Sequence, residues 1–406
     1  MELDRARRTD TQEDLIAELE ANEEFRRGEF PICAHKVYCA HAADAPLPRR
    51  VADAMRDAIE DASTNEKQFD KALDFIADTR RLAADFLGTD IEEISLTGPT
   101  SSGLNAVANG LDWKAGDEVV CYLDDYPADV YPWLNLERRG VKPVLLQTAR
   151  LGEITPEIVE NALTKRTRLV ALASAHNISG YRIDVEAIGT LCAEREVLFS
   201  LDAIQTLGAF PIPLNHVDFL SAGAQKWMLG PSGAGILFVK SDRRSLLRPM
   251  IIGGWNVESP NFIAQREIRY AEGGRKFEPG GYNNVPIAGM QAAIALLAEV
   301  GLPKISERIL LLVATLKDEL APVDFKFLSP NEESSRSTFL TFRSRRVAAE
   351  TLANALAEND VIVSLRVDRA DRSWLRVSPH FYNTFAEMER VAELLNRTQK
   401  WWRSWW

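Results

Sequence analysis

Short apolar runs alternate with segments of helical periodicity through most of the chain. Residues 169–173 form an apolar run typical of a buried strand, residues 185–192 carry apolar side chains at helical spacing, and residues 197–201 form a second apolar run. This order predicts a strand–helix–strand unit whose two strands lie parallel. Repetition of the unit predicts an α/β fold with a mostly parallel sheet flanked by helices. Further strands are expected over residues 118–122, 217–221 and 235–239.

The pattern changes after about residue 287. Residues 287–302 form a long apolar segment, which predicts a buried helix. Gln291 and Glu299 interrupt it, and it is shorter than the roughly 20 residues that span a bilayer, so we expect no membrane partner. The elements expected after it, which predict a smaller C-terminal α+β domain, are strands over 338–342, 361–365 and 374–377 and a helix over 347–356.

Composition narrows the class of protein. A chain of 406 residues with 46% apolar and 26% charged residues is long enough for two domains and unlike a disordered chain. Its 48 basic residues are outnumbered by 59 acidic ones, and the net charge of −11 argues against nucleic acid as a partner. The N-terminus, MELDRARRTDTQEDL, lacks the apolar core of a secretory signal, so we expect a cytoplasmic protein.

The cysteines and a tryptophan cluster add two expectations. The four cysteines form no CxxC pair, so we expect neither a disulfide framework nor a metal site. The last six residues, WWRSWW, are expected to cover a groove on the domain or on a partner subunit, and contact with a membrane surface is the weaker alternative.

Polar residues directly follow several apolar runs, and ligands bind at that edge of a parallel sheet. In SLTGPTSSGLNAVANGL, residues 95–111, Thr100 and Ser101 lie in the turn that begins a helix. Free backbone N–H groups and the positive end of the helix dipole would hold a phosphate there. The alternative is ordinary capping of the helix by a Ser or Thr side chain.

Asp202 and Lys226 follow two other apolar runs. A buried carboxylate needs a cationic or hydrogen-bonding partner, and a protonated pyridine nitrogen is one such partner for Asp202; capping of a helix is the alternative. Lys226 lies in a loop rich in Gly and Ala, with Trp227 beside it. Burial there would lower the pKa of the lysine and make its amine nucleophilic enough for a Schiff base, although most lysines are solvated.

Arg376, in SWLRVSPHFYNT, follows an apolar stretch of the small domain. A guanidinium group can hold a substrate carboxylate through two parallel hydrogen bonds. The alternative is a surface arginine in an ion pair.

Taken together, these segments resemble the class V aminotransferase group of pyridoxal 5'-phosphate enzymes, which includes cysteine desulfurases, kynureninases and isopenicillin N epimerase-like proteins. The similarity extends from VYCAHAADAPLP, which begins at Val37, to RVSPHFYNT, which ends at Thr384. It implies fold type I and a homodimer whose active sites are completed across a two-fold interface. We predict an N-terminal helical segment over residues 1–36 that packs on the small domain, a large cofactor-binding domain over 37–286 and a small domain over 287–406.

The resemblance also implies roles for individual residues. Lys226 would form the Schiff base with the cofactor, Asp202 would pair with the pyridine nitrogen, and Arg376 would bind the substrate carboxylate. The other implied contacts are the ring hydroxyl for Gln205 and Asn177, stacking on the ring for Tyr126, the phosphate for Thr100 and Ser101, and the substrate for His41.

Two departures from the family pattern concern the phosphate. The family often has Ser-x-His before the lysine, where this chain has Gly223, Ala224 and Gln225. Gly281, in KFEPGGYN, replaces a threonine that in relatives reaches the phosphate of the neighbouring subunit. Two hydroxyl donors are therefore missing. Either the affinity for the cofactor is lowered, or Gln225 compensates by contributing to cofactor binding.

A third departure concerns the reaction. Cysteine desulfurases carry a nucleophilic cysteine near the carboxylate-binding arginine, and no cysteine follows Cys192 here. Desulfuration through a protein persulfide is therefore disfavoured, although Cys33 and Cys39 lie in a segment that relatives place near the active site.

The resulting functional hypothesis is an enzyme that acts on an α-amino acid or a related amine through an external aldimine and a carbanion, with Lys226 as general base. An aminotransferase-type reaction is favoured by a small margin. β-Elimination, as in a C–S lyase, and epimerisation are the alternatives within the family. A non-catalytic binding module that retains the fold is the alternative from another class, and a nucleotide-binding Rossmann protein is excluded because no GxGxxG follows the first strands.

Overall fold

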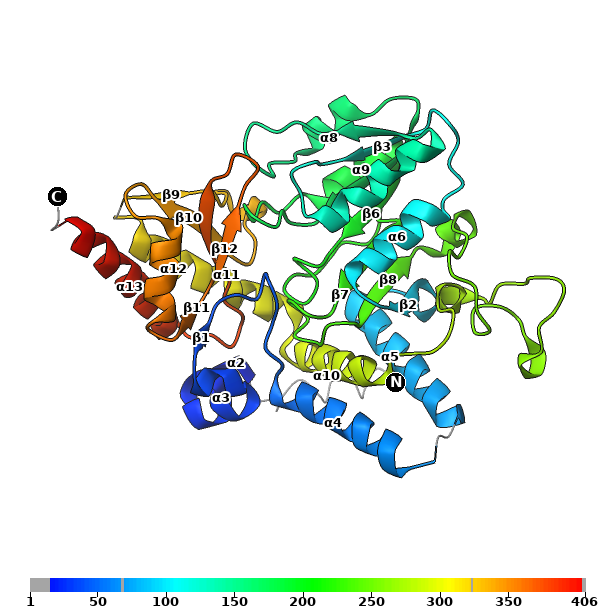
Figure 1. Ribbon diagram of the computed structural model, residues 1–406, viewed down its shortest axis with the longest axis horizontal. Coiled ribbons are helices and arrows are strands. Elements are labelled where there is room, and N and C mark those ends of the chain that lie inside the picture. The colour runs from blue at the N-terminus through cyan, green and yellow to red at the C-terminus, as the bar shows by residue number, and fades with distance from the viewer. Residues whose placement is uncertain (1–14, 67–68, 323, 404–406) are drawn as a thin grey trace, which may run out of the picture.

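The computed structural model describes residues 15–66, 69–322 and 324–403 and shows a large and a small domain (Figure 1). The large domain is built on a seven-stranded sheet with the order β2–β8–β7–β6–β5–β3–β4. The strands are β2 (Ile94–Thr97), β3 (Glu118–Cys121), β4 (Lys142–Leu145), β5 (Thr167–Ala173), β6 (Leu198–Asp202), β7 (Phe219–Gly223) and β8 (Gly235–Val239). Those from β3 to β7 pair in parallel, and β8 runs antiparallel to β2 and β7.

Helices cover both faces of this sheet. In β3, Val119 packs in a cluster with residues of α6, whereas Val120 packs in a second cluster with residues of α9 and α10. Because successive side chains of a strand point to opposite faces, both sets are buried, which explains the continuous apolar runs in the sequence. The helices are α4 (Arg49–Thr64), α5 (Phe69–Leu87), α6 (Thr100–Gly110), α7 (Tyr131–Leu134), α8 (Pro156–Ala162), α9 (Val185–Glu194) and α10 (Asn284–Val300).

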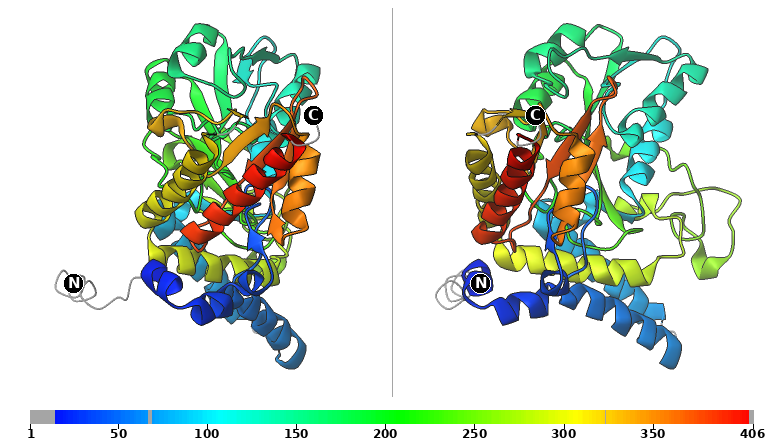
Figure 2. Two further views of the ribbon diagram at one scale, coloured as in Figure 1. Left: turned by 90° about the vertical axis from the view of Figure 1, so that its left-hand side faces the viewer. Right: turned by 60° about the vertical axis from the view of Figure 1, so that its left-hand side comes forward.

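The small domain packs helices against a four-stranded antiparallel sheet with the order β12–β13–β10–β9 (Figure 2). Its strands are β9 (Phe325–Phe327), β10 (Leu340–Ser344), β12 (Ser364–Val367) and β13 (Ser373–Val377). Its helices are α11 (Leu302–Leu320), α12 (Ala349–Ala357) and α13 (Phe385–Arg403). A short parallel pair joins β1 (Val37–Tyr38) to β11 (Val361–Ile362) beside this domain.

The N-terminal helices α2 (Leu15–Ala21) and α3 (Glu23–Glu29) contact the small domain through two ion pairs, each with a buried arginine. Arg26 of α3 forms an ion pair with Glu387 of α13 at 3.0 Å, and Arg308 of α11 forms one with Glu20 of α2 at 2.5 Å. This part of the chain therefore adds to the small domain rather than to the central sheet.

The expected α/β fold with a mostly parallel, helix-flanked sheet is confirmed. The segment expected to be a helix over 287–302 is α10, which begins three residues earlier and packs along α4 (Figure 2). The strand expected over 361–365 is two strands, because the chain leaves β1 and joins β13 at residue 364. The amphipathic helices α4, α5, α11 and α13 were not among the expected elements, because their charged faces break the apolar runs.

Three further expectations concern a membrane span, a metal site and the C-terminal tryptophan cluster. No single helix in the described ranges combines the length and hydropathy needed to cross a bilayer, and the pair α10 and α11, bent by 81°, passes by length and composition only. Within those ranges there is also no group of His, Cys, Asp or Glu arranged to hold a metal ion. The side chains of the C-terminal tryptophan cluster lie outside the described part of the chain.

Candidate active site

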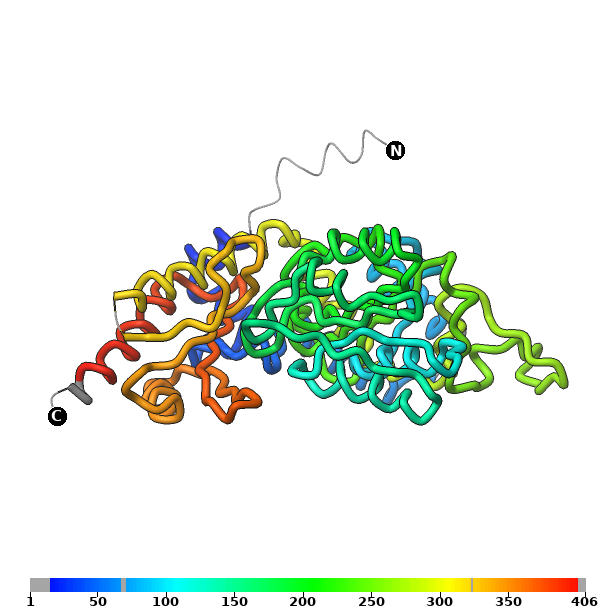
Figure 3. Tube along the Cα trace, turned by 90° about the horizontal axis from the view of Figure 1, so that it is seen from above, coloured from blue at the N-terminus to red at the C-terminus, as the bar shows by residue number. Residues whose placement is uncertain are grey.

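The polar residues singled out from the sequence follow strands that run in the same direction. Asn177 follows β5, Asp202 ends β6, and Lys226 follows β7. Because these neighbouring strands are parallel, their carboxyl ends meet at one edge of the sheet. The small domain lies beside the large one (Figure 3) and contributes Arg376 to the same region. The structure thus brings together four residues from different parts of the sequence.

Lys226 lies in an environment that favours its neutral amine. Burial lowers the pKa of Lys226 to about 8; the Asp202 carboxylate raises it, whereas the Arg376 guanidinium lowers it. The Nζ atom lies 5.6 Å from the centroid of the Tyr126 ring. An amine that loses its proton close to neutral pH can act both as a nucleophile and as a general base.

Two glycines allow close contacts on either side of the loop around Lys226. The Gly223 N–H donates to the Thr100 hydroxyl at 2.9 Å, and a Cβ at Gly223 would lie 2.3 Å from Oε1 of Gln225. Gly223 therefore makes room for Gln225, whose Oε1 is buried without a hydrogen-bond partner among the described residues. On the other side Gly208, with φ of 99°, approaches the Trp227 carbonyl so closely that a Cβ would lie 2.3 Å from its oxygen.

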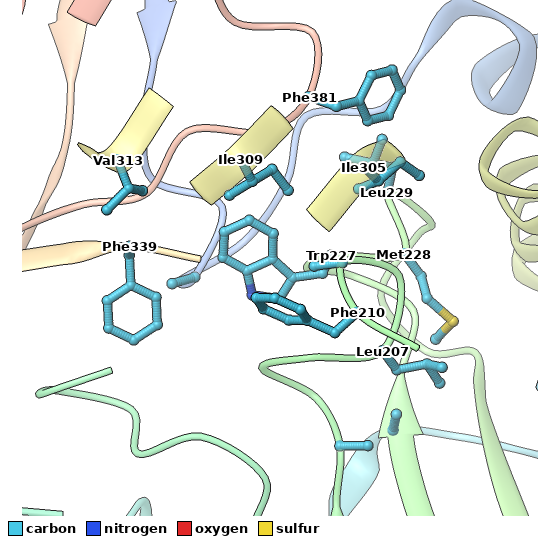
Figure 4. Packing of buried hydrophobic residues seen from close by; sticks show 14 of the residues in the cluster. Leu207, Phe210, Trp227, Met228, Leu229, Ile305, Ile309, Val313, Phe339 and Phe381 are labelled. Atoms are coloured by element: carbon cyan, nitrogen blue, oxygen red, sulfur yellow. The ribbon is translucent and has the colours of Figure 1, made fainter. Parts of the chain in front are cut away.

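Trp227 anchors this loop in the core between the domains. Its ring is 1% exposed and belongs to the same buried cluster as Phe210, Ile309 and Phe339 (Figure 4). The carbonyl oxygen of Trp227 accepts a hydrogen bond from His380 Nε2 at 3.0 Å. The residue after Lys226 is thus fixed to both domains, which restricts the directions that the lysine can take.

Asp202 shares its buried position with a second acid that the sequence analysis did not single out. Burial raises the pKa of Asp202 and, more strongly, that of Asp129, and the two carboxyl groups hydrogen-bond each other. One carboxyl of such a pair holds a proton, because two buried charges repel each other. The Ile204 N–H donates to Asp202 Oδ1 at 2.7 Å, which is a turn contact and not the cap of a helix. Asp129 lies in the DDYPADVYPW segment, where only its position after a strand hinted at the site.

Gln205 and His41 make most of their polar contacts within the protein. Gln205 accepts from Trp227 Nε1 at 3.1 Å and donates from Nε2 to the Ala42 carbonyl at 3.1 Å, which leaves one N–H of its amide for a ligand. His41 is fully buried, and its ring nitrogens contact the Ser378 carbonyl oxygen and the Tyr382 hydroxyl. Both ring nitrogens of His41 are therefore engaged within the protein. This geometry does not support the expected contact between His41 and the substrate.

Arg376 is a buried arginine with unfilled hydrogen-bonding capacity. It is 1% exposed and donates from Nη1 to the Asn177 carbonyl. Its Nε and Nη2 atoms have no partner in the described part of the chain, and neither does Oδ1 of Asn177. Since buried polar atoms are nearly always hydrogen-bonded, these atoms indicate a place where a polar ligand binds. The surface ion pair considered for Arg376 is excluded.

The first turn of α6 opens into a cavity of about 540 Å³, which Ser101 and Thr97 line. The residue before the helix is Pro99, and no side chain caps the helix, so the capping alternative is not realised. The hydroxyl of Thr100 accepts from Gly223, as described above, and keeps its own proton for donation. The hydroxyl of Thr97 is buried without a partner among the described residues. Free N–H groups and hydroxyls at this end of the site suit an anion such as a phosphate.

Comparisons with known proteins give matches that cover most of the chain. The family model described as Aminotransferase class-V matches residues 37–391. A protein of Pyrococcus abyssi named as a probable cysteine desulfurase is 25% identical over 392 residues, which are 92% of this chain and 97% of that protein. Among solved structures, a cysteine desulfurase from Thermococcus onnurineus has a TM-score of 0.84 at 24% identity, covering 92% of this chain and 97% of its own. The cystine C–S lyase C-DES, in complex with cysteine persulfide, has a TM-score of 0.82 at 22% identity, covering 90% and 99%.

Proposed function

The chain belongs to the aminotransferase class-V family of pyridoxal 5'-phosphate-dependent enzymes, and on this premise we propose that it cleaves a carbon–sulfur bond of an α-amino acid by β-elimination. Two relatives bear the name of probable cysteine desulfurase, and one structural neighbour is a C–S lyase. These comparisons support the lyase alternative more strongly than the aminotransferase-type reaction that the sequence slightly favoured.

The residues present fit the cofactor. Lys226 would carry it, Asp202 would face its ring nitrogen, and the first turn of α6 with Ser101 would hold its phosphate. The buried carboxamide oxygens of Gln225 and Asn177, which lack partners among the described residues, would be satisfied beside it. When bound, the cofactor supplies an electron-accepting ring that stabilises negative charge on the substrate α-carbon.

Individual residues of the protein then have separate roles in the reaction. Arg376 holds the substrate carboxylate with the two guanidinium nitrogens that have no partner among the described residues. Lys226, whose pKa is about 8, takes the proton from the α-carbon as that bond breaks. The bond between the β-carbon and sulfur breaks next, and the sulfur leaves with the bonding electron pair as a thiolate. Hydrolysis of the remaining fragment gives a 2-oxo acid and ammonia.

The protonation state of the cysteines determines whether the sulfur is transferred to the protein or released. Burial raises the pKa of Cys33 to about 12, and it also raises the pKa of Cys39, Cys121 and Cys192. These are the four cysteines of the sequence, and none is a thiolate at neutral pH. Sulfur is therefore released to solution rather than transferred to the protein. The proposal rests on one combination of features. Lys226 has a lowered pKa, Asp202 lies beside it, Arg376 has guanidinium nitrogens without a partner among the described residues, and none of the four cysteines is a reactive thiol.

The test uses the full chain loaded with pyridoxal 5'-phosphate. Incubation with an S-substituted cysteine should release thiol, ammonia and pyruvate in equal amounts with no added 2-oxo acid, and Lys226→Ala should abolish all three products. A product that forms only when an acceptor 2-oxo acid is added would show transamination instead. Protein that takes up no cofactor would show a non-catalytic module.

We also propose that the enzyme is a homodimer. The segment 250–268 extends from the large domain on the side away from the small domain (Figures 1 and 3) and exposes Met250, Ile251, Phe262 and Ile268. Exposed apolar groups of this kind mark protein interfaces. Ile251 and Gly281 also line the cavity at the first turn of α6, so a second subunit bound there would close it. Sedimentation as a monomer at micromolar concentration would contradict this proposal.

A further inference from the structure

The hairpin formed by β12 and β13 carries four arginines at the boundary between the domains, and two of them are paired with acids. Near the tip, Arg369 forms an ion pair with Asp124 of the large domain. Arg372 forms an ion pair with Asp368 at 2.7 Å. Asp124 and Asp368 are thus already engaged by these two arginines.

The other two arginines, Arg366 and Arg376, lie on the same face of the hairpin. In the antiparallel register Ser364 is opposite Arg376, and Arg366 is opposite Trp374. Because side chains two residues apart share a face, Arg366 and Arg376 are diagonal neighbours, with backbones roughly 7–8 Å apart. This is the face that turns toward the large domain, where Arg376 contacts Asn177.

Neither of these arginines has a carboxylate partner among the described residues. Arg366 is half-buried, and it donates a hydrogen bond from Nη1 to the carbonyl of Leu365 at 2.8 Å. Arg376 has two unpartnered nitrogens, as described above. Two neighbouring guanidinium groups that are withdrawn from water repel each other, and this arrangement is unfavourable unless an anion binds between or beside them.

The positive charge of Arg366 affects the catalytic lysine. This charge lowers the pKa of Lys226 and of Arg376, and the pKa of Arg366 itself is lowered by burial and raised by Tyr126. Arg366 therefore lies close enough to Lys226, Arg376 and Tyr126 for their charges to interact. One carboxylate fills the fork of a single guanidinium group. A substrate carboxylate on Arg376 thus leaves Arg366 free for a different group.

We propose that Arg366 binds a second anionic group of the substrate, so that the preferred substrate is a cysteine whose sulfur carries a substituent with a carboxylate or a similar anion. This inference rests on the proposed C–S lyase function for the identity of the substrate. Arg376 then binds the α-carboxylate and Arg366 binds the distal anion of the same substrate, and the carbon–sulfur bond that breaks lies between these two groups.

The test compares two substrates that differ by one charge. S-carboxymethyl-L-cysteine and S-carbamoylmethyl-L-cysteine have nearly the same shape, but only the first carries a distal carboxylate. The loaded enzyme should process the carboxymethyl compound with kcat/KM about tenfold higher or more, as expected for a charge-assisted hydrogen bond. Arg366→Gln should remove this preference by lowering kcat/KM for the carboxymethyl compound about tenfold relative to the carbamoylmethyl compound.

Arg343 supplies a matched control. It lies on β10, on the same face of the sheet as Arg376, and is half-buried. Unlike Arg366, it stacks on an aromatic ring, with its guanidinium carbon 5.0 Å from the centroid of Trp374. Arg343→Gln removes one positive charge from the same sheet and should leave the preference between the two substrates unchanged. Equal kcat/KM values for both substrates in the unmodified enzyme would overturn the proposal. An equal loss for both substrates in Arg366→Gln would also overturn it, since Arg366 would then share the α-carboxylate.

A second measurement separates this inference from the proposed reaction. Succinate and butyrate have the same number of carbons and no amine, so their binding requires no chemistry. Isothermal titration calorimetry of the loaded protein should show succinate binding about tenfold tighter than butyrate, and Arg366→Gln should abolish the difference. If neither cysteine derivative reacts but succinate is still preferred, the proposed function fails and the distal anion site stands. If succinate binds no more tightly than butyrate, the site is refuted whatever the enzyme catalyses.

Discussion

The indole N–H of Trp227 donates a hydrogen bond to the side-chain oxygen of Gln205 at 3.1 Å, and this contact joins the loop after β7 to the loop after β6. Trp227 directly follows Lys226, and Gln205 lies three residues after Asp202. The relative placement of the amine and the carboxylate therefore depends on a buried contact between their neighbours.

Trp227→Phe keeps most of the apolar packing but removes the donor. Gln205 then has a buried oxygen without a partner, which costs about 1–3 kcal/mol. We expect the free energy of unfolding to fall by about that amount and cofactor affinity to fall with it, measured by urea denaturation and by equilibrium dialysis of pyridoxal 5'-phosphate. The exchange Trp113→Phe removes a buried indole bond to the Ala108 carbonyl far from the site and should reduce stability without reducing cofactor affinity.

Gly208→Ala should displace the lysine loop. The added Cβ would lie 2.3 Å from the Trp227 carbonyl oxygen, and φ at this position is 99°. Gly88→Ala is the control, because Gly88 also has positive φ, of 70°, but its Cβ would meet no atom within 4 Å. The control should lose about 1 kcal/mol of stability, whereas Gly208→Ala should lose more and should retain little cofactor. Equal losses in the two variants would show that the close approach to Trp227 has no effect.

The attachment of the cofactor to Lys226 should depend on pH. Only the neutral amine attacks an aldehyde, and the pKa of Lys226 is about 8 in the cofactor-free protein. The rate of attachment should therefore rise about tenfold per pH unit below that value and level off above it. Because the Arg366 cation lowers this pKa, Arg366→Gln should move the midpoint to higher pH. A midpoint near that of an exposed lysine in the unmodified protein would contradict the burial argument. The measurement is stopped-flow absorbance over a series of buffers.

The two buried acids should differ in their importance. Asp202→Asn removes the charge that faces the ring nitrogen, and we expect kcat to fall by about 100-fold or more, as is usual when a developing charge loses its partner. Asp129 holds the proton of the pair, so Asp129→Asn replaces one donor by another and should retain most activity. A severe loss in Asp129→Asn with intact circular dichroism would assign the ionised role to Asp129 instead.

The ion pair between Arg26 and Glu387 should hold the N-terminal helices on the small domain. The Arg26 side chain is 6% exposed, so Arg26→Met leaves a buried carboxylate unpaired at a cost of about 3–5 kcal/mol. Arg27 pairs with Glu23 at 2.7 Å on the surface, and Arg27→Met should cost less than about 1 kcal/mol. Thermal denaturation followed by circular dichroism compares the two. Similar Tm values would mean that α3 contributes little to the stability of the small domain.

Some elements were predictable because their signals are local. The strands of the parallel sheet appear as apolar runs because both of their faces are buried, and β8 was expected with the bounds that the structure shows. The helices with broad polar faces, such as α4, were missed, because a single apolar stripe among charged residues gives a weaker signal than a continuous run. The position of Asp202 and Lys226 at the ends of strands was likewise local information.

The sequence by itself determined the class of fold, the family and the lysine that would hold the cofactor, because each depends on residue type and on order along the chain. Tertiary structure alone decided that His41 is engaged within the protein, that Asp129 shares the position of Asp202, and that Arg366 and Arg376 have no acidic partner among the described residues. These facts depend on which groups from distant segments meet and on how far water is excluded from them. Burial and pairing of this kind arise only when the two domains pack together.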